Sequence, residues 1–233
     1  MRLDKFLCEL QTGTRSQVKT YVRQGLVTVN GSVVKSSDIK IDENADCVCF
    51  RGQILQYRRF VYYMLNKPAG VVSATEDNVS KTVLELLRPE DRRDGLFPAG
   101  RLDKDTEGFL LLTNDGELAH RLLSPKKHVD KTYRVSLEKP LRPEDIDMLE
   151  KGVNIGEERL TLPAKVSVED TLTILLTIHE GKFHQVKRML QAVGNQVTAL
   201  KRISFGGLLL DKSLQPGEYR ELTEQEVSIL HEA

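Results

Sequence analysis

The chain has 233 residues, of which 39% are hydrophobic and 29% charged. This composition is ordinary for a folded globular chain, and it excludes wholesale disorder and collagen-like sequence. No apolar run approaches the roughly 20 residues that a transmembrane helix needs, and the acidic residues Asp4 and Glu9 argue against a signal peptide. Three cysteines do not make a disulfide framework. We therefore expect a cytoplasmic protein without a membrane association.

The formal net charge is zero, with 34 basic and 34 acidic residues, but the charges are unevenly distributed. Residues 1–60 contain ten Lys or Arg and six Asp or Glu, so the first quarter of the chain is basic. The remainder contains 24 basic and 28 acidic residues and is mildly acidic. A basic N-terminal segment is a modest indication of a polyanionic partner.

The first elements of the chain are predicted to be two helices followed by a β-hairpin. Apolar residues recur at i, i+3, i+4 and i+7 from Leu3, which is typical of an amphipathic helix. Thr14 and Gln17 have the spacing of a capping box, so a second helix should begin there and end at Gly25. Residues 26–34 contain Asn-Gly between two apolar segments, which predicts a hairpin with a type I′ turn.

The second predicted helix carries Arg15, Lys19 and Arg23 at i, i+4 and i+8. Like charges at this spacing repel slightly, so helix stability does not explain them. RNA phosphates would, although a solvated helix face is the simpler alternative. The order of these elements in residues 2–50, including TRSQVKTYVRQGLVTVNG at 14–31, resembles the S4 domain, a small RNA-binding domain first recognised in a ribosomal protein. The resemblance implies that Arg15, Lys19 and Arg23 position the RNA backbone and do not read its sequence.

Two further expectations concern the end of this segment. Cys47 and Cys49 alternate along a predicted strand and should be buried on one face of it, and no metal site is expected there because further ligands are missing. Residues 53–59 are polar and are interpreted as a linker. We therefore expect an RNA-binding domain at residues 1–58 and a second domain at residues 59–233.

The second domain mixes short strands and short helices without a regular βαβ repeat. A turn is expected at 66–70. Strands are expected at 60–65, 109–113, 131–137 and 172–178, and helices at 82–87, 143–151 and 183–194, with others ending at 123 and beginning near 223. This order predicts an α+β fold with a mixed, largely antiparallel sheet.

Familiar cofactor and metal motifs are absent from the sequence, including the P-loop, the dinucleotide-binding glycine motif and the zinc-binding H-E-x-x-H. The five histidines are scattered and have no partner at ligand spacing. We therefore expect no cofactor and no metal. The nine residues at 100–108, rich in charged and turn-forming types, directly precede a buried strand, which is a position where a catalytic carboxylate can lie. The alternative is a turn whose Asp residues cap their own backbone.

Three segments taken together favour the catalytic interpretation over the turn: GRLDKDTEGFLLLTNDG at 100–116, KTYRV at 131–135 and EGKFHQVKRM at 180–189. They resemble, in order, the three core motifs of pseudouridine synthases, and NKPAGVVSA at 66–74 fits as well. The resemblance covers essentially the whole chain. It is greatest to the branch that carries an S4 domain and modifies ribosomal RNA, and within it to enzymes of small-subunit (16S) ribosomal RNA.

The resemblance implies isomerisation of uridine to pseudouridine without a cofactor. Asp103 is the catalytic carboxylate, Tyr133 stacks on the base and takes the C5 proton, and Lys187 pairs with Asp103. Many relatives have arginine at the position of Lys187, so the bidentate geometry is lost while the charge is kept. Asp105 is interpreted as structural.

The target base must leave its stack before it can react. Arg101 is the candidate for filling the vacated space or holding a phosphate, and Lys104 and Arg188 are candidate backbone contacts. The expected partner is ribosomal RNA or a small-subunit assembly particle, and the expected state is a monomer. The alternatives are an RNA-binding assembly factor without catalysis, a large-subunit pseudouridine synthase, and an N-glycosidase that releases uracil.

Overall fold

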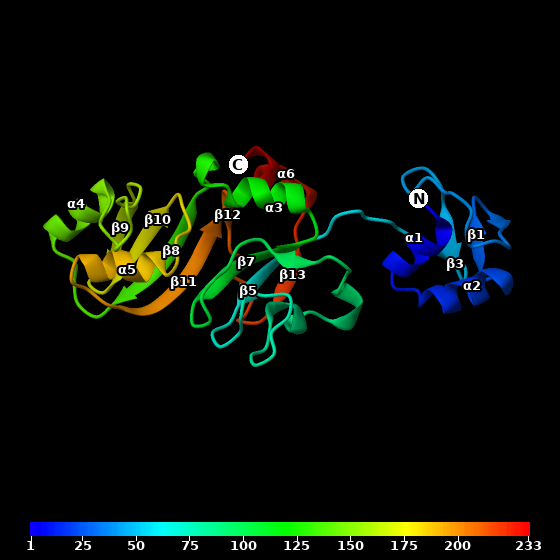
Figure 1. Ribbon diagram of the computed structural model, residues 1–233, viewed down its shortest axis with the longest axis horizontal. Coiled ribbons are helices and arrows are strands. Elements are labelled where there is room, and N and C mark those ends of the chain that lie inside the picture. The colour runs from blue at the N-terminus through cyan, green and yellow to red at the C-terminus, as the bar shows by residue number, and fades with distance from the viewer. The chain divides into compact units, whose positions relative to one another are not determined.

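The computed structural model describes residues 1–233, and the chain divides into two compact units (Figure 1). The first unit contains Met1–Phe60 together with Arg88–Gly95, and the second contains Val61–Leu87 and Leu96–Ala233. No helix in the chain combines the length and the apolar character needed to cross a membrane.

The first unit is a four-stranded antiparallel sheet with two helices. Its elements are α1 (Leu3–Glu9), α2 (Arg15–Arg23), β1 (Val27–Val29), β2 (Ser32–Val33), β3 (Val48–Phe50) and β4 (Gln53–Leu55), with the strand order β2-β1-β3-β4. The capping box of Thr14 and Gln17 is present at the start of α2. Asn30 and Gly31 have φ values of 50° and 79°, as the type I′ turn between β1 and β2 requires.

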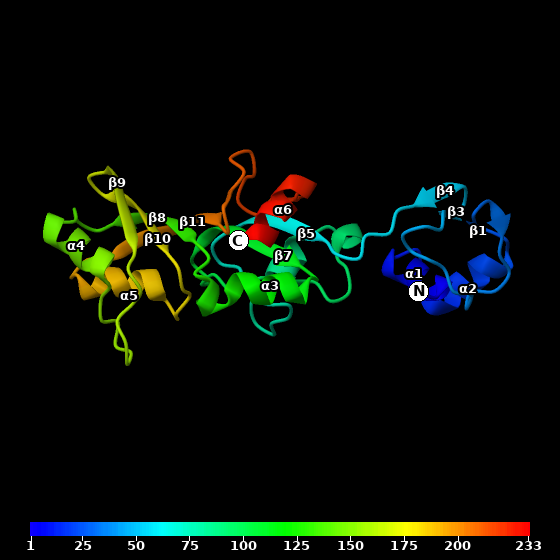
Figure 2. The same cartoon turned by 90° about the horizontal axis from the view of Figure 1, so that it is seen from above.

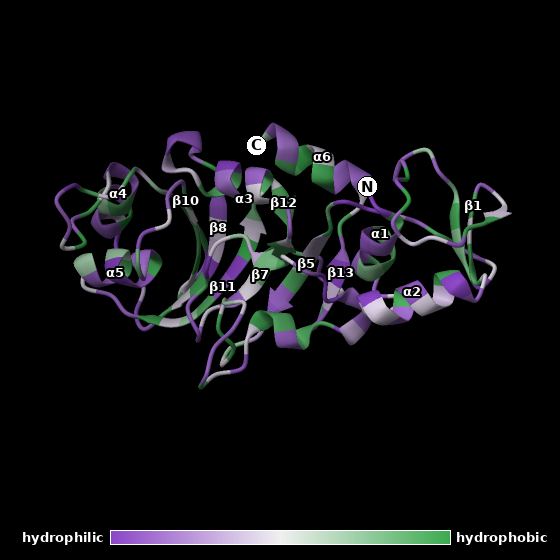
Figure 3. Ribbon diagram, turned by 45° about the vertical axis from the view of Figure 1, so that its right-hand side comes forward, coloured by the Kyte–Doolittle hydropathy of each residue, from purple (hydrophilic) through white to green (hydrophobic).

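The helices of the first unit are amphipathic, and the bands of unlike hydropathy along α2 are visible in Figure 3. The core is formed by apolar side chains from both helices, from β1 and β3 and from the segment between β2 and β3, namely Leu3, Phe6, Leu7, Val18, Val22, Val27, Ile41 and Val48. Arg15, Lys19 and Arg23, hereafter the α2 stripe, are exposed, so the apolar face of α2 is buried and its cationic face meets solvent.

Two expectations for this unit are wrong. Cys47 is exposed and Cys49 is half-buried, because the alternation of β3 turns Val48 toward the core instead. The segment expected to be a linker begins with β4, which pairs with β3. Arg51 and Gly52 both have positive φ and reverse the chain in a tight turn between β3 and β4. An Arg-Gly pair is not a typical turn sequence, so this hairpin was not predicted.

The second unit is built on one nine-stranded sheet. Its elements are β5 (Tyr62–Lys67), β6 (Phe97–Pro98), β7 (Glu107–Thr113), α3 (Gly116–Leu123), β8 (Lys131–Leu137), α4 (Pro143–Lys151), β9 (Lys165–Asp170), β10 (Thr173–Ile178), α5 (Gln185–Ala192), β11 (Val197–Phe205), β12 (Leu208–Leu209), β13 (Tyr219–Glu221) and α6 (Glu224–Glu232), with short 3₁₀ turns at Val83–Leu86 and Pro125–Lys127 and a third, Pro89–Asp91, in the first unit. The order is β13-β5-β7-β11-β8-β10-β9, with β6 on β7 and β12 on β11. Only β7 and β11 run parallel, which confirms the largely antiparallel α+β fold.

Helices cover both faces of this sheet in different places (Figures 1 and 2). The larger core joins α4, α5 and the turn at Val83–Leu86 to side chains of β5, β7, β8 and β10. A second core joins α3 and α6 to the other face of β5 and β7. β7 is therefore buried on both faces, which explains its unbroken apolar run, whereas β8 alternates because only one of its faces is covered.

The junction between β7 and β11 depends on a glycine. Gly108 has a φ of 101°, and a Cβ built on it lies 2.2 Å from the carbonyl oxygen of Arg202. Only glycine allows the two backbones to approach this closely. The parallel pairing brings the loop that precedes β7 beside β11 and, through β11, beside β8.

Candidate active site

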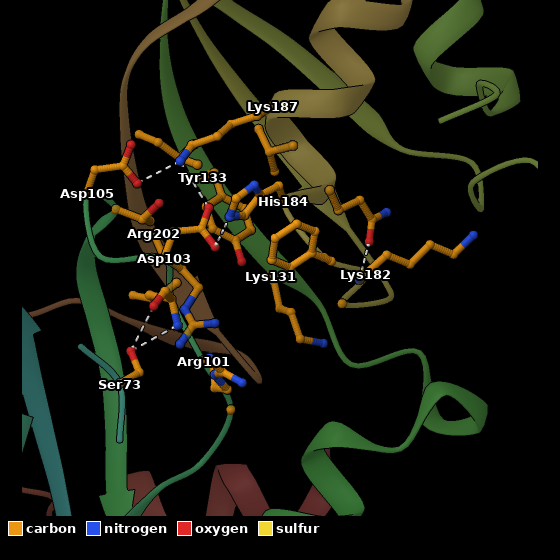
Figure 4. A pocket seen from close by; sticks show the side chains of 18 of the residues that line it. Ser73, Arg101, Asp103, Asp105, Lys131, Tyr133, Lys182, His184, Lys187 and Arg202 are labelled. Atoms are coloured by element: carbon orange, nitrogen blue, oxygen red, sulfur yellow. Dashed lines mark hydrogen bonds and ion pairs between the residues drawn. The ribbon is translucent and has the colours of Figure 1, made fainter. Parts of the chain in front are cut away.

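A cavity of about 1060 Å³ opens in the second unit (Figure 4). It is lined by the loop between β6 and β7, by β8, by β11 and by the start of α5. Its floor includes Tyr133 and Lys131 of β8 and Arg202 of β11. Asp103 and Lys187, expected to be partners from the sequence, both line it.

Lys67 holds the loop that carries Asp103. Its side chain is fully buried, and its Nζ donates to the carbonyl oxygens of Asp103 at 3.0 Å, Lys104 at 3.3 Å and Thr106 at 2.8 Å. These three carbonyls belong to the loop itself, so a single ammonium group fixes its backbone. Burial lowers the pKa of Lys67 to about 8, and the nearby carboxylates of Asp105 and Asp103 oppose this shift.

Ser73 fixes the same loop from a second side. Its hydroxyl oxygen accepts from the backbone N–H of Leu102 at 3.1 Å and donates to the carbonyl oxygen of Leu102 at 2.9 Å. No role was predicted for Lys67 or Ser73 from the sequence, although both lie in the 66–74 segment that resembles the family. The expected turn at 66–70 is wrong in its first two residues, because β5 continues through Lys67.

Asp103 lies among cationic and titratable side chains. Lys187 Nζ is 3.1 Å from Asp103 Oδ2 and 2.6 Å from Asp105 Oδ1, so one lysine is shared by two carboxylates. His184 Nε2 is 3.5 Å from Asp103 Oδ1. The hydrogen bond from Lys187 holds the pKa of Asp105 below its ordinary value, and the two carboxylates together raise the pKa of Lys187, against the opposite effect of its burial.

The expected pairing of Lys187 with Asp103 is therefore present, but two details differ from the expectation. The side chain of Asp103 is 25% exposed, so its carboxylate remains accessible from the cavity. Asp105 makes the shorter contact with Lys187 while its own side chain is 72% exposed. Asp105 is thus part of the charge arrangement and does not only shape the turn.

Tyr133 presents a free hydroxyl to the cavity. Only 8% of the residue is exposed, and it is held between Leu176 of β10 and Arg202 of β11 in the sheet register. Its hydroxyl makes no hydrogen bond within the protein, and it is not among the buried polar atoms that lack a partner. A ligand in the cavity can therefore reach it.

The cavity is strongly cationic. Its lining contains six lysine or arginine residues, namely Arg101, Lys104, Lys131, Lys182, Lys187 and Arg202, and only two aspartates. Arg101 is exposed and makes no ion pair or hydrogen bond, whereas Lys104 Nζ donates to Ser80 Oγ at 3.0 Å. Burial lowers the pKa of Lys131 to about 8, with the charge of Arg202 as the second cause.

Arg188 lies outside the cavity lining. Its guanidinium pairs with Glu157 at 2.9 Å and donates to the carbonyl oxygens of Phe183 and Ile155. Lys187 and Arg188 thus point to different partners, as their adjacent positions on a helix require. Because the donors of Arg188 are used within the protein, we do not include it among the proposed RNA contacts.

In the first unit, Arg15, Lys19 and Arg23 are all exposed and make no hydrogen bond or ion pair. A solvated stripe without counter-ions of its own is available to an external polyanion. No three His, Cys, Asp or Glu side chains in the chain lie together in a way that could hold a metal ion.

An accessible carboxylate, a free phenol and a lysine thus meet in a cationic pocket, and the other unit of the chain carries an exposed cationic helix. These features are typical of an enzyme that acts on a nucleic acid. The comparisons with known proteins give the same class.

Residues 61–192 match the family model described as RNA pseudouridylate synthase, and residues 1–47 match the S4 domain. The RNA pseudouridine synthase YtzG of Bacillus subtilis is 53% identical over 100% of this chain and 99% of its own length. Ribosomal small subunit pseudouridine synthase A is 46% identical in Vibrio cholerae, over 98% of both chains, and 42% identical in Escherichia coli, over 98% of this chain and 99% of that one. A crystal structure of a pseudouridylate synthase covers 99% of both chains with a TM-score of 0.70 and 41% identity.

The chain belongs to the RNA pseudouridine synthase family and carries an N-terminal S4 domain. The resemblance drawn from the sequence is confirmed, and the enzyme is an isomerase.

Proposed function

We propose that the protein converts a specific uridine of small-subunit (16S) ribosomal RNA to pseudouridine, with Asp103 as the catalytic carboxylate. The observation that carries the proposal is the accessible carboxylate of Asp103, 3.1 Å from Lys187 in a cationic pocket that also contains a free tyrosine hydroxyl. The small-subunit target is supported by the relatives named for that activity, which match over nearly their full length.

The first step breaks the bond between N1 of uracil and C1′ of ribose. The departing base takes the bonding electrons, and C1′ becomes electron-poor. Asp103 either attacks C1′ and forms an ester, or removes the proton from C2′ and leaves a glycal. Lys187 supports both routes because its ammonium favours the ionised form of a neighbouring carboxylate.

The second step joins C5 of the rotated uracil to C1′. On the first route the ester bond between C1′ and Asp103 breaks as this bond forms, and on the second route Asp103 returns its proton to C2′. The proton on C5 must then leave and N1 must gain one, so the product has the same atoms as the substrate. Tyr133 is the proposed acceptor of the C5 proton, since its hydroxyl faces the cavity without a partner in the protein. Its ring, which forms part of the floor, would stack on the base.

RNA binding is divided between the two units. The α2 stripe contacts phosphates through charge alone, which gives affinity without reading sequence. In the catalytic unit, Arg101 and Lys104 border the pocket, and Arg101 is the proposed residue that fills the space left by the flipped uridine. We assign residues 1–58 to RNA binding and residues 59–233 to catalysis.

We further propose that the protein acts in the cytoplasm as a monomer. The decisive experiment incubates the protein with ribosomal RNA that contains uridine tritiated at C5. Release of tritium to water from small-subunit RNA is the predicted result. Release of labelled free uracil would instead show a glycosidase, and no release would show a binding protein. Release from large-subunit RNA alone would overturn the proposed target.

A further inference from the structure

Phe183 is an exposed aromatic side chain at the catalytic pocket. It is 74% exposed, and it lines the cavity together with Asp103. Single exposed apolar residues are common on protein surfaces, so exposure alone has no meaning. Among the large exposed apolar side chains, however, only Phe183 and Leu123 line this cavity, and only Phe183 is aromatic.

The ring of Phe183 is held from one side only. It stacks on the ring of His184, with 3.8 Å between the ring centroids and 21° between the ring planes. His184 in turn lies 3.5 Å from the carboxylate of Asp103, and its backbone is left-handed, with φ of 48°. Such a conformation is uncommon outside glycine and places the two rings at the entry to α5. The outer face of Phe183 has no partner in the protein.

The cavity has room and charge for more than the target nucleotide. Its volume of about 1060 Å³ is at the upper end of the range, about 300–1,000 Å³, of pockets that enclose a small molecule. Lys182 and Lys187 are paired with carboxylates, but Arg101 and Lys104 have no acidic partner and offer cationic groups for more than one phosphate. Every nucleotide base offers a flat face that an exposed aromatic ring can stack on.

We propose that Phe183 forms a second base-binding subsite, in which its outer face stacks on the base of the nucleotide next to the target uridine. This inference rests on the proposed function and extends it to the neighbouring nucleotide. Phe183 touches RNA but not the reacting atoms, so it contributes to substrate binding. His184 acts as the support that holds the ring in position.

The test measures tritium release as a function of RNA concentration for the wild type, Phe183→Ala, Phe183→Trp and Leu209→Ala. Leu209 is 71% exposed on the same unit but lies outside the cavity, so its variant is the matched control. Phe183→Ala should raise KM by about 5- to 150-fold with little change in kcat, because stacking on one base is lost. Phe183→Trp and Leu209→Ala should keep the wild-type KM within about twofold.

A second arm identifies the base. Once the modified uridine is mapped, synthetic RNAs without the base on its 5′ or 3′ side are compared with the intact RNA. With one of these RNAs, the KM of the wild type should rise by the same factor as Phe183→Ala raises it on the intact RNA. The KM of Phe183→Ala should be the same on that RNA as on the intact RNA. An unchanged KM for Phe183→Ala on the intact RNA would overturn the subsite. So would a KM that rises by the same factor in the wild type and in Phe183→Ala on both RNAs that lack a base. A wild type that releases no tritium would overturn the proposed function itself.

Discussion

Replacing Lys187 by methionine should slow catalysis without unfolding the protein. The ammonium of Lys187 is 3.1 Å from Asp103 Oδ2, and at an effective dielectric constant of ~20 this separation corresponds to ~5 kcal/mol of gross attraction. Both side chains are about one quarter exposed, so solvent reduces the net value to that of a charge-assisted hydrogen bond, ~1.5–3 kcal/mol. If this energy orients and ionises the carboxylate in the transition state, kcat falls by about 10- to 150-fold.

The assay is single-turnover tritium release between pH 6 and 9, with Lys187→Arg and Arg188→Met as companions. Without the ammonium, the carboxylate of Asp103 loses the contact that orients it, so the activity of Lys187→Met should be low throughout this pH range. Lys187→Arg should keep much of the activity because the charge remains. Arg188→Met should resemble the wild type, since Arg188 pairs with Glu157 outside the cavity. A normal profile for Lys187→Met, with the loss in Arg188→Met, would refute the reasoning.

Three other perturbations test separate parts of the account. The pKa of Lys67 is near 8 in the folded protein against 10.5 for an ordinary lysine, so the unfolded chain holds more protons above pH 8 and stability should rise with pH. Urea unfolding at pH 7 and 9.5 should show that Lys67→Met removes ~2 kcal/mol of this rise; an unchanged rise would assign it to other groups. Gly108→Ala should cost ~2–5 kcal/mol of unfolding free energy because its methyl group meets the backbone of Arg202, whereas Gly217→Ala, with a similar φ and open space, should cost only ~1–2 kcal/mol; equal costs would contradict the close approach. Neutralising the α2 stripe should reduce the slope of log affinity against log salt by about 2, and an unchanged slope would make the stripe an ordinary solvated surface.

Local sequence signals predicted the elements whose causes are local. The capping boxes at Thr14 and Thr223, the Asn-Gly turn after β1 and the strand at Lys131–Leu137 all lie where the sequence placed them. Each depends on a few neighbouring residues, so its signal is contained within one short segment.

Features that depend on long-range contacts were missed. The longest strand, β11, was not predicted, since Val197–Phe205 is stabilised by pairing with β8 and β7 and carries Lys201 and Arg202 in its middle. The burial of Lys67 is invisible in the sequence for the same reason, because three of the carbonyl oxygens that it binds are 36 to 39 residues away.

The residues of the active site also come together only through long-range contacts. Asp103, Tyr133 and Lys187 were identified by resemblance to a family and not by their spacing, since they lie on a loop, a strand and a helix that only the fold brings together. His184 was dismissed as a scattered histidine because its partner, Asp103, is 81 positions earlier in the chain. The pairing of His184 with Asp103 is visible only in the folded structure, where their side chains are 3.5 Å apart.

The central claim is that Asp103, and not its neighbour Asp105, performs the reaction. Tritium release by Asp103→Asn is the most direct test, because the amide keeps the shape of the loop residue and removes its anionic oxygen. The account predicts no detectable turnover for Asp103→Asn, with RNA binding nearly unchanged, and substantial turnover for Asp105→Asn. One tenth or more of the wild-type turnover in Asp103→Asn would contradict it, and loss of turnover in Asp105→Asn instead would move the assignment to that carboxylate.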